Sequence, residues 1–149
     1  MAESSAISES APRRRGAVAV ICRQRRLLVI RRSQQVVAPG AYCFPGGAIE
    51  CQESEEQALV RELREELNVA VKPLRRLWQS VTPWQVELAW WSAELSADAV
   101  PRPAPAEVES CHWLTLGEMA ALPELLESNR HFLAAVARGE IVLADGAGE

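Results

Sequence analysis

Residues 47–69 join a glycine turn to a segment with one apolar face and one acidic face. Leu59, Leu63 and Leu67 recur at i, i+4 and i+8, the spacing of an amphipathic helix that docks on a core. Because successive helical residues are about 100° apart, the acidic residues project within roughly one 100° sector beside that stripe. Those acidic residues are Glu62, Glu65 and Glu66. The docked apolar stripe therefore fixes the direction in which the carboxylates point.

Three carboxylates on one helix face repel one another, and a bound cation relieves that repulsion. Oxygen-only ligands suit a hard cation, Mg²⁺ or Mn²⁺, and Mg²⁺ typically keeps several waters and contacts the phosphates of a substrate. The competing interpretation is a solvated charged face held by i, i+4 pairs such as Arg61 with Glu65. Pro45, the glycine turn and the register of the acidic positions favour the metal site.

The segment resembles the Nudix box, whose pattern is Gly, five residues, Glu, seven residues, then Arg-Glu-apolar-x-Glu-Glu-x-Gly-apolar. The matching positions are Gly47, Glu53, Arg61, Glu62, Leu63, Glu65, Glu66 and Val69. Asn68 replaces the second glycine, and we expect the helix to end there, because Asn tolerates the left-handed conformation best after Gly. Gln52 is a second departure, since many members of the family have glycine at that position.

Short apolar and β-branched runs predict the other elements. Strands are expected over residues 16–22, 27–30, 42–44, 76–81, 85–95 and 111–114, and later helices over 116–121 and 130–138. Residues 96–106 contain Pro101, Pro103 and Pro105 and should form an extended loop. This is a mixed α/β order. The resemblance implies an α/β/α sandwich with a mixed β-sheet, in which the box forms a loop, a helix and a loop on one side.

The resemblance also implies an activity, the attack of water on phosphorus in a nucleoside diphosphate linked to another group. A cation beside clustered carboxylates neutralises charge on a phosphoryl oxygen and lowers the pKa of a bound water. The residues that the resemblance assigns to the metal are Glu62, Glu65, Glu66 and Gly47. Arg61 and Glu53 would pair to brace the loop against the helix, and Glu50 would assist from the edge.

Within the family the chain looks most like the MutT type, which cleaves nucleoside triphosphates to a monophosphate and pyrophosphate. Arg32 ends the second strand and Phe44 precedes Pro-Gly-Gly, where that group has an arginine and an aromatic residue. Glu107 matches a later catalytic carboxylate, and Asn129, allowing one inserted residue, matches a base-reading asparagine. The implied substrate-binding residues are Arg32, Phe44, Asn129, Gly46 and Gly47. The simpler alternatives are a core position for Phe44, a solvated position for Glu107 and an N-cap role for Asn129.

Two other functions stay open. One is an ADP-ribose or nucleotide-sugar pyrophosphatase, since Pro83 lies about where that group has a downstream proline. The other is a non-catalytic Nudix-fold module that only binds nucleotides. Such modules are free to lose the carboxylates that this chain retains, which argues against that alternative.

Length and charge limit the remaining possibilities. The chain has 149 residues, and we expect one domain over residues 13–140, a disordered tail over 1–12 and a C-terminal tail over 141–149. The formal net charge of −4 argues against a nucleic-acid polymer as partner, because its phosphates demand a broad basic surface. No apolar run predicts a membrane helix or a signal peptide. We therefore expect a cytoplasmic monomer or homodimer whose partner is a small nucleotide.

Overall fold

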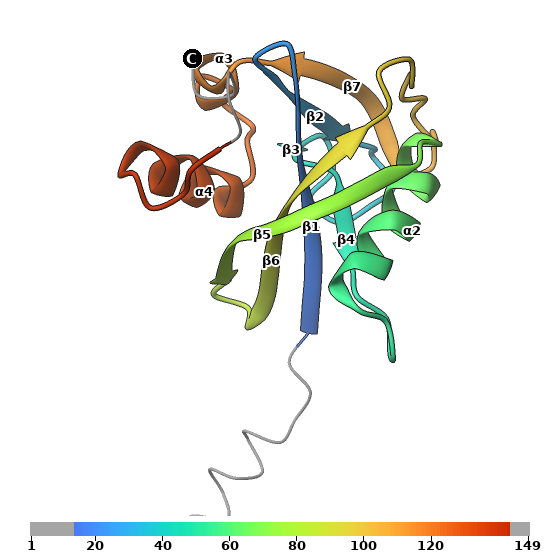
Figure 1. The fold of residues 1–149 in the computed structure, drawn as a ribbon, viewed down its shortest axis with the longest axis horizontal. Helices are drawn as coiled ribbons and strands as arrows, with labels where there is room; N and C mark the ends of the chain where they lie inside the picture. Colours follow the sequence, from blue (N-terminus) through green and yellow to red (C-terminus); the bar gives the residue numbers. More distant parts are fainter. Residues whose placement is uncertain (1–13, 144–149) are drawn as a thin grey trace, which may run out of the picture.

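The computed structural model describes residues 14–143, which form a β-sheet with helices on both faces (Figure 1). The strands are β1 (Arg14–Arg23), β2 (Arg26–Arg32), β3 (Tyr42–Cys43), β4 (Gly46–Ala48), β5 (Val71–Val81), β6 (Val86–Leu95) and β7 (Val108–Leu114). The helices are α2 (Glu55–Leu67), α3 (Leu116–Ala120) and α4 (Glu127–Ala137). The tail expected over residues 1–12, and the C-terminal tail from residue 144, lie outside the described residues. Within residues 14–143, no helix is both long and apolar enough to cross a membrane.

β1 is the central strand of the sheet. The strand order is β3-β2-β1-β6-β5, while β4 also pairs with β1 and β7 with β2. β1 runs parallel to β6, from Arg14 opposite Val86 to Ile21 opposite Ala93. The other pairings are antiparallel. The presence of both kinds of pairing confirms the expected mixed sheet.

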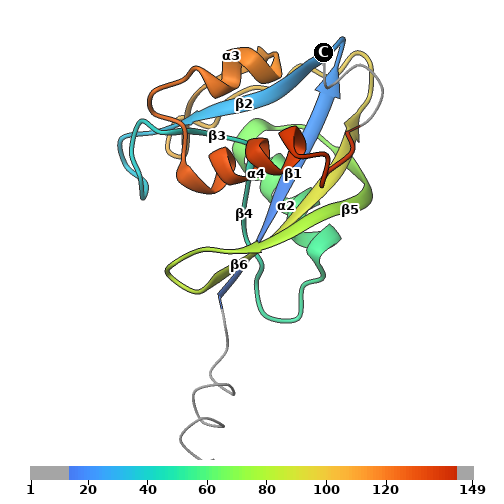
Figure 2. The same cartoon turned by 90° about the vertical axis from the view of Figure 1, so that its left-hand side faces the viewer.

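Alternate residues of β1 face opposite sides of the sheet, and each side packs against different helices. Ala19 lies in a core cluster with Leu63 of α2. Val20, the next residue, lies in a second cluster with Phe132 of α4. Figure 2 shows α4 in front of the sheet and α2 behind it, which confirms the expected α/β/α sandwich. Ile141, just past the expected domain end at residue 140, is buried in the second cluster.

Local sequence signals set both ends of α2. The side chain of Ser54 accepts a hydrogen bond from the N–H of Gln57, and the Gln57 side chain accepts one from the N–H of Ser54, which together form a capping box. Asn68 caps the other end in the left-handed conformation, with φ 58° and ψ 37°, and confirms the expected helix end. Gln52 also has a positive φ, of 68°. Asn68 and Gln52, the two departures from the family pattern, therefore both have the positive φ that glycine adopts most easily.

Several elements differ from the expectations; among them, β7 begins at Val108 rather than at residue 111. Gly46–Ala48, a glycine turn by sequence, is the short strand β4, because Gly46 takes a φ of 150° and pairs with Val18 of β1. β5 begins at Val71 rather than at residue 76, and it tolerates Pro73 because it is an edge strand with a register shift at that point. α4 begins at Glu127 rather than at residue 130, so the expected N-cap role of Asn129 is wrong. Residues 96–106 form a loop, as expected.

Candidate functional site

β4 lies against the acidic face of α2, and two glycines make this approach possible. The N–H of Gly46 donates a hydrogen bond to Oε1 of Glu66 at 3.1 Å. A Cβ on Gly46 would lie 2.2 Å from the carbonyl oxygen of Ala17, and a Cβ on Gly47 would lie 2.4 Å from the carboxyl carbon of Glu62. Because real Cβ atoms do not approach other atoms so closely, only glycine brings the backbone next to these carboxylates at either position.

Three carboxylates converge beside this glycine segment. Glu62, Glu66 and Glu107 each offer a carboxylate oxygen, and these oxygens all lie within 4.8 Å of one another. Glu62 is 9% exposed and Glu66 is 6% exposed, whereas Glu107 is half-buried. Mg²⁺ and Mn²⁺ prefer oxygen ligands, so this donor set fits a hard divalent cation. We call Glu62, Glu66 and Glu107 the acidic cluster.

The loop before β7 brings Glu107 to the helix. The backbone N–H groups of Arg102 and Ala104 donate to carbonyl groups in the last turn of α2, both at 2.8 Å. The side chain of Asn68 donates to the carbonyl of Arg102 at 2.9 Å. The two backbone bonds satisfy carbonyl groups that a helix end leaves unpaired. They also fix the loop, and with it Glu107, beside α2.

Ser33 holds the same loop from the end of β2. Its backbone N–H donates to the carbonyl of Glu107 at 3.1 Å, and its hydroxyl donates to the carbonyl of Ala106 at 2.8 Å. Ser33 is 4% exposed. Sequence reasoning missed this residue because its contacts are between positions 33 and 106–107, which only the fold brings together.

Burial and mutual repulsion disfavour the charged forms of the acidic cluster. Burial raises the pKa of Glu66 to about 8, against the hydrogen bond from Gly46 and with the help of the charges on Glu62 and Glu107. Burial likewise raises the pKa of Glu62, despite a hydrogen bond from Arg61. A divalent cation would supply the positive charge that opposes both effects. The electrostatics of the cluster therefore agree with its donor chemistry.

Glu65 lies outside the acidic cluster. Its side chain is 50% exposed, and its Oε1 accepts a hydrogen bond from Nη1 of Arg61 at 3.1 Å. This is the i, i+4 pair of a solvated helix face, although Glu62 and Glu66 on the same helix are buried. The structure thus brings two of the three acidic helix residues together with Glu107 and leaves Glu65 at the surface.

Arg61 and Glu53 form the pair that the sequence predicts. Nε of Arg61 donates to Oε2 of Glu53 at 2.6 Å, and Nη2 donates to Oε1 at 3.0 Å. The same guanidinium donates to the carboxylate of Glu62 at 2.9 Å and to the carbonyl of Ala48 in β4 at 2.8 Å. Hydrogen bonds from Arg61, and then from the backbone at Glu50, lower the pKa of Glu53 to about 2. Arg61 therefore links the loop, the strand β4 and one member of the acidic cluster.

Arg32 lies close enough to the acidic cluster for its charge to lower the pKa of Glu66, which burial raises. Its Nε donates to the carbonyl of Val37 at 2.6 Å. A guanidinium beside a cluster of this kind can neutralise a phosphate. The position of Arg32 is therefore compatible with the phosphate contact that the family resemblance implies.

Phe44 and Asn129, which the resemblance assigns to binding of a base, are both buried within the protein. Phe44 is 3% exposed and packs edge-to-face with Trp90 and Phe132, with ring centroids 6.2 and 5.3 Å away. Its ring is enclosed by the core and is not presented to a ligand. Asn129 is also 3% exposed, and its Oδ1 accepts a hydrogen bond from the N–H of Phe44 at 2.9 Å. Both side chains make their contacts within the protein.

Glu55, in the first turn of α2, ties the helix to three strands. Its carboxylate accepts two hydrogen bonds from Arg76 of β5, at 3.1 and 2.8 Å. It also accepts one from Arg15 of β1 at 3.0 Å and one from Trp91 of β6 at 2.8 Å. Burial would raise the pKa of Glu55, but the bonds from Trp91 and Arg76 outweigh it and lower the pKa below 4.5. Sequence reasoning missed Glu55 because acidic residues are ordinary in the first turn of a helix.

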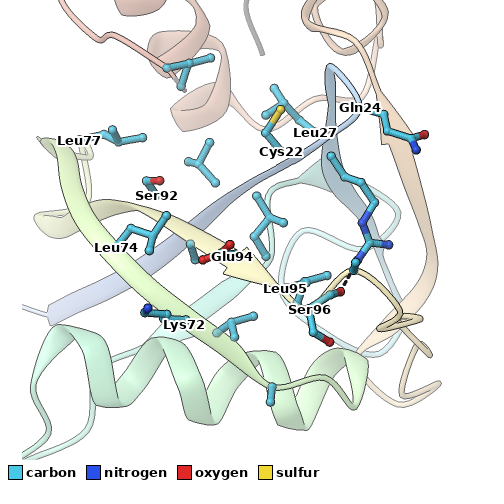
Figure 3. Close-up of a pocket in the computed structure, with 18 residues that line it drawn as sticks. Cys22, Gln24, Leu27, Lys72, Leu74, Leu77, Ser92, Glu94, Leu95 and Ser96 are labelled. Carbon is cyan, nitrogen blue, oxygen red and sulfur yellow. Dashed lines mark hydrogen bonds between the residues drawn. The ribbon is translucent and has the colours of Figure 1, made fainter. Parts of the chain in front are cut away.

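A cavity of about 790 Å³ lies away from the acidic cluster, over β5, β6 and the end of β1 (Figure 3). Its lining includes Cys22, Leu77, Ser92 and Glu94. Among the described residues, none that lines this cavity belongs to the acidic cluster or to the glycine segment. The convergence of carboxylates, and not the size of a cavity, therefore identifies the candidate site.

Known proteins have sequences similar to that of this chain. The family model of the NUDIX domain matches residues 12–136. Over 108 residues, which make up 71% of this chain, the sequence is 32% identical to an NAD-capped RNA hydrolase NudC of Pseudomonas aeruginosa. Over 51 residues, which make up 34% of this chain, it is 47% identical to the CTP pyrophosphohydrolase of Escherichia coli. The match spans 38% of the length of each of these two curated relatives.

Solved structures agree with the sequence comparison. The crystal structure of a MutT NUDIX hydrolase from Burkholderia pseudomallei matches this chain with a TM-score of 0.63 and 28% sequence identity. The match covers 83% of this chain and 97% of that one. The two chains therefore share a fold over most of their length.

Proposed function

The chain belongs to the NUDIX family, and from this premise we propose that it is a hydrolase that uses a divalent cation to cleave a phosphoanhydride bond of a nucleotide. The observation that carries the proposal is the convergence of Glu62, Glu66 and Glu107 within 4.8 Å beside Gly47. Buried carboxylates that repel one another are costly to maintain without a cation. A non-catalytic module that only binds nucleotides, the alternative left open by the sequence, does not require such carboxylates.

The acidic cluster would hold Mg²⁺ or Mn²⁺, and the family resemblance adds Gly47 to these ligands. When bound, the cation would neutralise charge on a phosphoryl oxygen. Arg61 would orient the carboxylate of Glu62, to which it donates at 2.9 Å, while Glu53 holds the guanidinium in place. Glu65 would act on the site through its bond to Arg61. Arg32 would contribute positive charge toward the phosphates of the substrate.

For the substrate we propose a nucleoside triphosphate, cleaved to a monophosphate and pyrophosphate as in the MutT type. Two relatives support this choice by their names, the MutT NUDIX hydrolase of B. pseudomallei and the CTP pyrophosphohydrolase of E. coli. The place of Arg32 at the end of β2, close to Glu66, supports it from within this chain.

A second candidate is a nucleotide linked through its diphosphate to another moiety, such as ADP-ribose or a nucleotide sugar. The similarity to NAD-capped RNA hydrolases favours this candidate, since an NAD cap joins two nucleotides through a diphosphate. Pro83, in the turn between β5 and β6, is the position that the resemblance connects with this group. The formal net charge of −4 favours a small nucleotide over a polymer.

A nucleotide panel with Mg²⁺ tests the proposal. The panel should contain the common ribo- and deoxyribonucleoside triphosphates, ADP-ribose, a nucleotide sugar and NAD, with pyrophosphate and phosphate measured separately. We expect pyrophosphate from at least one triphosphate and no turnover when the metal is chelated. Faster cleavage of ADP-ribose than of any triphosphate would select the second candidate. The absence of cleavage of every nucleotide with Mg²⁺ and with Mn²⁺ would exclude both.

A further inference from the structure

We propose that Asn129 is a positioning residue for the acidic cluster, and that it acts through the backbone of Phe44–Gly47. This inference rests on the proposed function, because it concerns how the chain holds its cation site. Asn129 belongs to α4, on the face of the sheet opposite α2 (Figure 2). Its contribution therefore crosses the sheet to reach the carboxylates.

Both ends of the Asn129 amide are bonded within the protein. Oδ1 accepts a hydrogen bond from the N–H of Phe44 at 2.9 Å, and Nδ2 donates to Oγ of Ser128 at 3.2 Å. The residue is 3% exposed. A buried amide is costly unless its hydrogen bonds are made, and here they are made to fixed protein groups. This arrangement suits an anchor better than a group that must turn toward a ligand.

Bonds to three different elements hold the segment that follows Phe44. Phe44 donates its N–H to Asn129 of α4. The carbonyl of Pro45 accepts from the N–H of Ala19 in β1 at 2.9 Å. The N–H of Gly46 donates to Oε1 of Glu66 in α2 at 3.1 Å. Three successive residues are thus fixed in turn, and the first of these bonds depends on Asn129.

Loss of the Asn129 anchor would release the start of this segment. Pro45 has no N–H with which to form another bond, so the backbone between Phe44 and Gly46 would keep the bond from Ala19 but would leave the N–H of Phe44 without its partner. Gly46 would then direct its N–H toward Glu66 less accurately, and Gly47 would be less closely fixed against Glu62. Groups that hydrogen-bond a metal ligand directly, as the N–H of Gly46 bonds Glu66, typically contribute roughly 10 to 100-fold in metal affinity or activity, and Asn129 acts on such a group.

The test measures Mn²⁺ affinity of the full chain without substrate, by electron paramagnetic resonance of free Mn²⁺. Asn129→Leu keeps the side chain close to its natural size but removes the acceptor, and it should weaken Mn²⁺ binding by roughly 10-fold, the lower end of the effect of a group bonded directly to a ligand. Asn129→Asp keeps an acceptor oxygen and should restore most of the affinity. Ser128→Ala removes only the partner of Nδ2, on the same helix, and should bind Mn²⁺ like the unaltered protein. The ratio of KM values among nucleotides with different bases should stay unchanged in all three variants.

Unchanged Mn²⁺ affinity in a folded Asn129→Leu variant would overturn the inference, and a changed base preference at constant Mn²⁺ affinity would show that Asn129 reads the base. If the unaltered protein binds no Mn²⁺, the proposed function fails together with the inference. If it binds Mn²⁺ and the variant binds equally well, the inference fails alone.

A measurement on the unaltered protein decides the question if Asn129→Leu does not fold. In a Mg²⁺ titration followed by NMR, the backbone amide of Phe44 and the side-chain amide of Asn129 should shift with the same midpoint as the amide of Gly46. Fixed resonances for Phe44 and Asn129 while Gly46 shifts would contradict the proposed coupling.

Discussion

The carboxylate groups of Glu66 and Glu107 lie within 4.8 Å of each other, although one comes from the last turn of α2 and the other from the loop before β7. Helix periodicity alone places both Glu65 and Glu66 beside Glu62. The structure instead uses a residue from a distant part of the sequence, and it leaves Glu65 half exposed beside Arg61. The acidic centre is therefore a product of the tertiary fold as well as of helix register.

This relationship predicts unequal effects of three substitutions that each remove one charge at constant size. Glu66→Gln and Glu107→Gln should each lower turnover and Mn²⁺ affinity by at least roughly 10 to 100-fold, because each removes a ligand that we propose for the cation. Glu65→Gln should have a smaller effect, since Glu65 bonds Arg61 and is half exposed. Steady-state kinetics and metal titrations of the three variants check this order. A larger loss of turnover and Mn²⁺ affinity in Glu65→Gln than in Glu107→Gln would indicate that Glu65 is a ligand of the metal.

Gly47→Ala should damage the site more than the fold. The added Cβ would lie 2.4 Å from the carboxyl carbon of Glu62, so that carboxylate must move. We expect turnover to fall by roughly 10-fold or more. Gly117→Ala is the matched control, because a Cβ at Gly117 meets nothing within 4 Å. Equal activity of the two variants would show that Glu62 can shift without consequence.

Arg61→Ala should lower both the melting temperature and the turnover number. The substitution removes both bonds to Glu53, together with those to Glu62 and to the carbonyl of Ala48. It leaves the carboxylate of Glu53 without its main partner, which costs more for a partly buried pair than for a surface pair. Thermal unfolding and kinetics measure the two effects. Arg64→Ala, at an exposed position of the same helix, should change neither.

Glu55→Gln should change the pH dependence of stability. The folded pKa of Glu55 lies below its ordinary value of 4.5, so its stabilisation is present above that value and is lost as pH falls through the folded pKa. The unaltered protein should therefore melt above Glu55→Gln at neutral pH, and the difference should shrink on acidification below 4.5. Melting curves of both proteins across this range test the sign. Glu56→Gln, exposed in the same helical turn, controls for loss of charge near the helix start.

Phe44→Ala should act on stability rather than on recognition of the base. Phe44 is 3% exposed between Trp90 and Phe132, and truncation of a buried phenylalanine costs about 3 to 5 kcal/mol of unfolding free energy. Denaturant unfolding measures this loss. Trp84→Ala removes a larger aromatic side chain that is 75% exposed and should cost far less. A stable Phe44→Ala variant with a raised KM for nucleotides would instead place the ring in the binding site.

Sequence reasoning succeeded where local signals determine structure. The spacing of Leu59, Leu63 and Leu67 correctly predicts which face of α2 is buried, and Asn68 correctly predicts where the helix ends. Sequence reasoning failed at Gly46–Ala48, because two consecutive glycines are typical of a turn. The sequence gives no sign that this segment forms a strand with β1.

The sequence predicts part of the candidate site. The pair between Arg61 and Glu53 follows from the family pattern and is present in the structure. The buried positions of Phe44 and Asn129 did not follow from it, because they depend on the aromatic residues that surround them. Ser33 and Glu55 could not be found from the sequence, since their partners lie in strands or loops that only the fold places beside them.

The hydrogen bonds between the last turn of α2 and the backbone of Arg102 and Ala104 have a consequence for engineering. They join the helix and the loop that bears Glu107 into one unit, so the three carboxylates of the acidic cluster should keep their relative positions when the surrounding chain is altered. Residues 96–100 precede the first of these bonds, and a chimera that imports a segment of another length there should keep its metal affinity. An insertion between Ala104 and Glu107 should not be tolerated. The connection that leaves β6 is thus a place where the length of the chain can vary without rebuilding the acidic cluster.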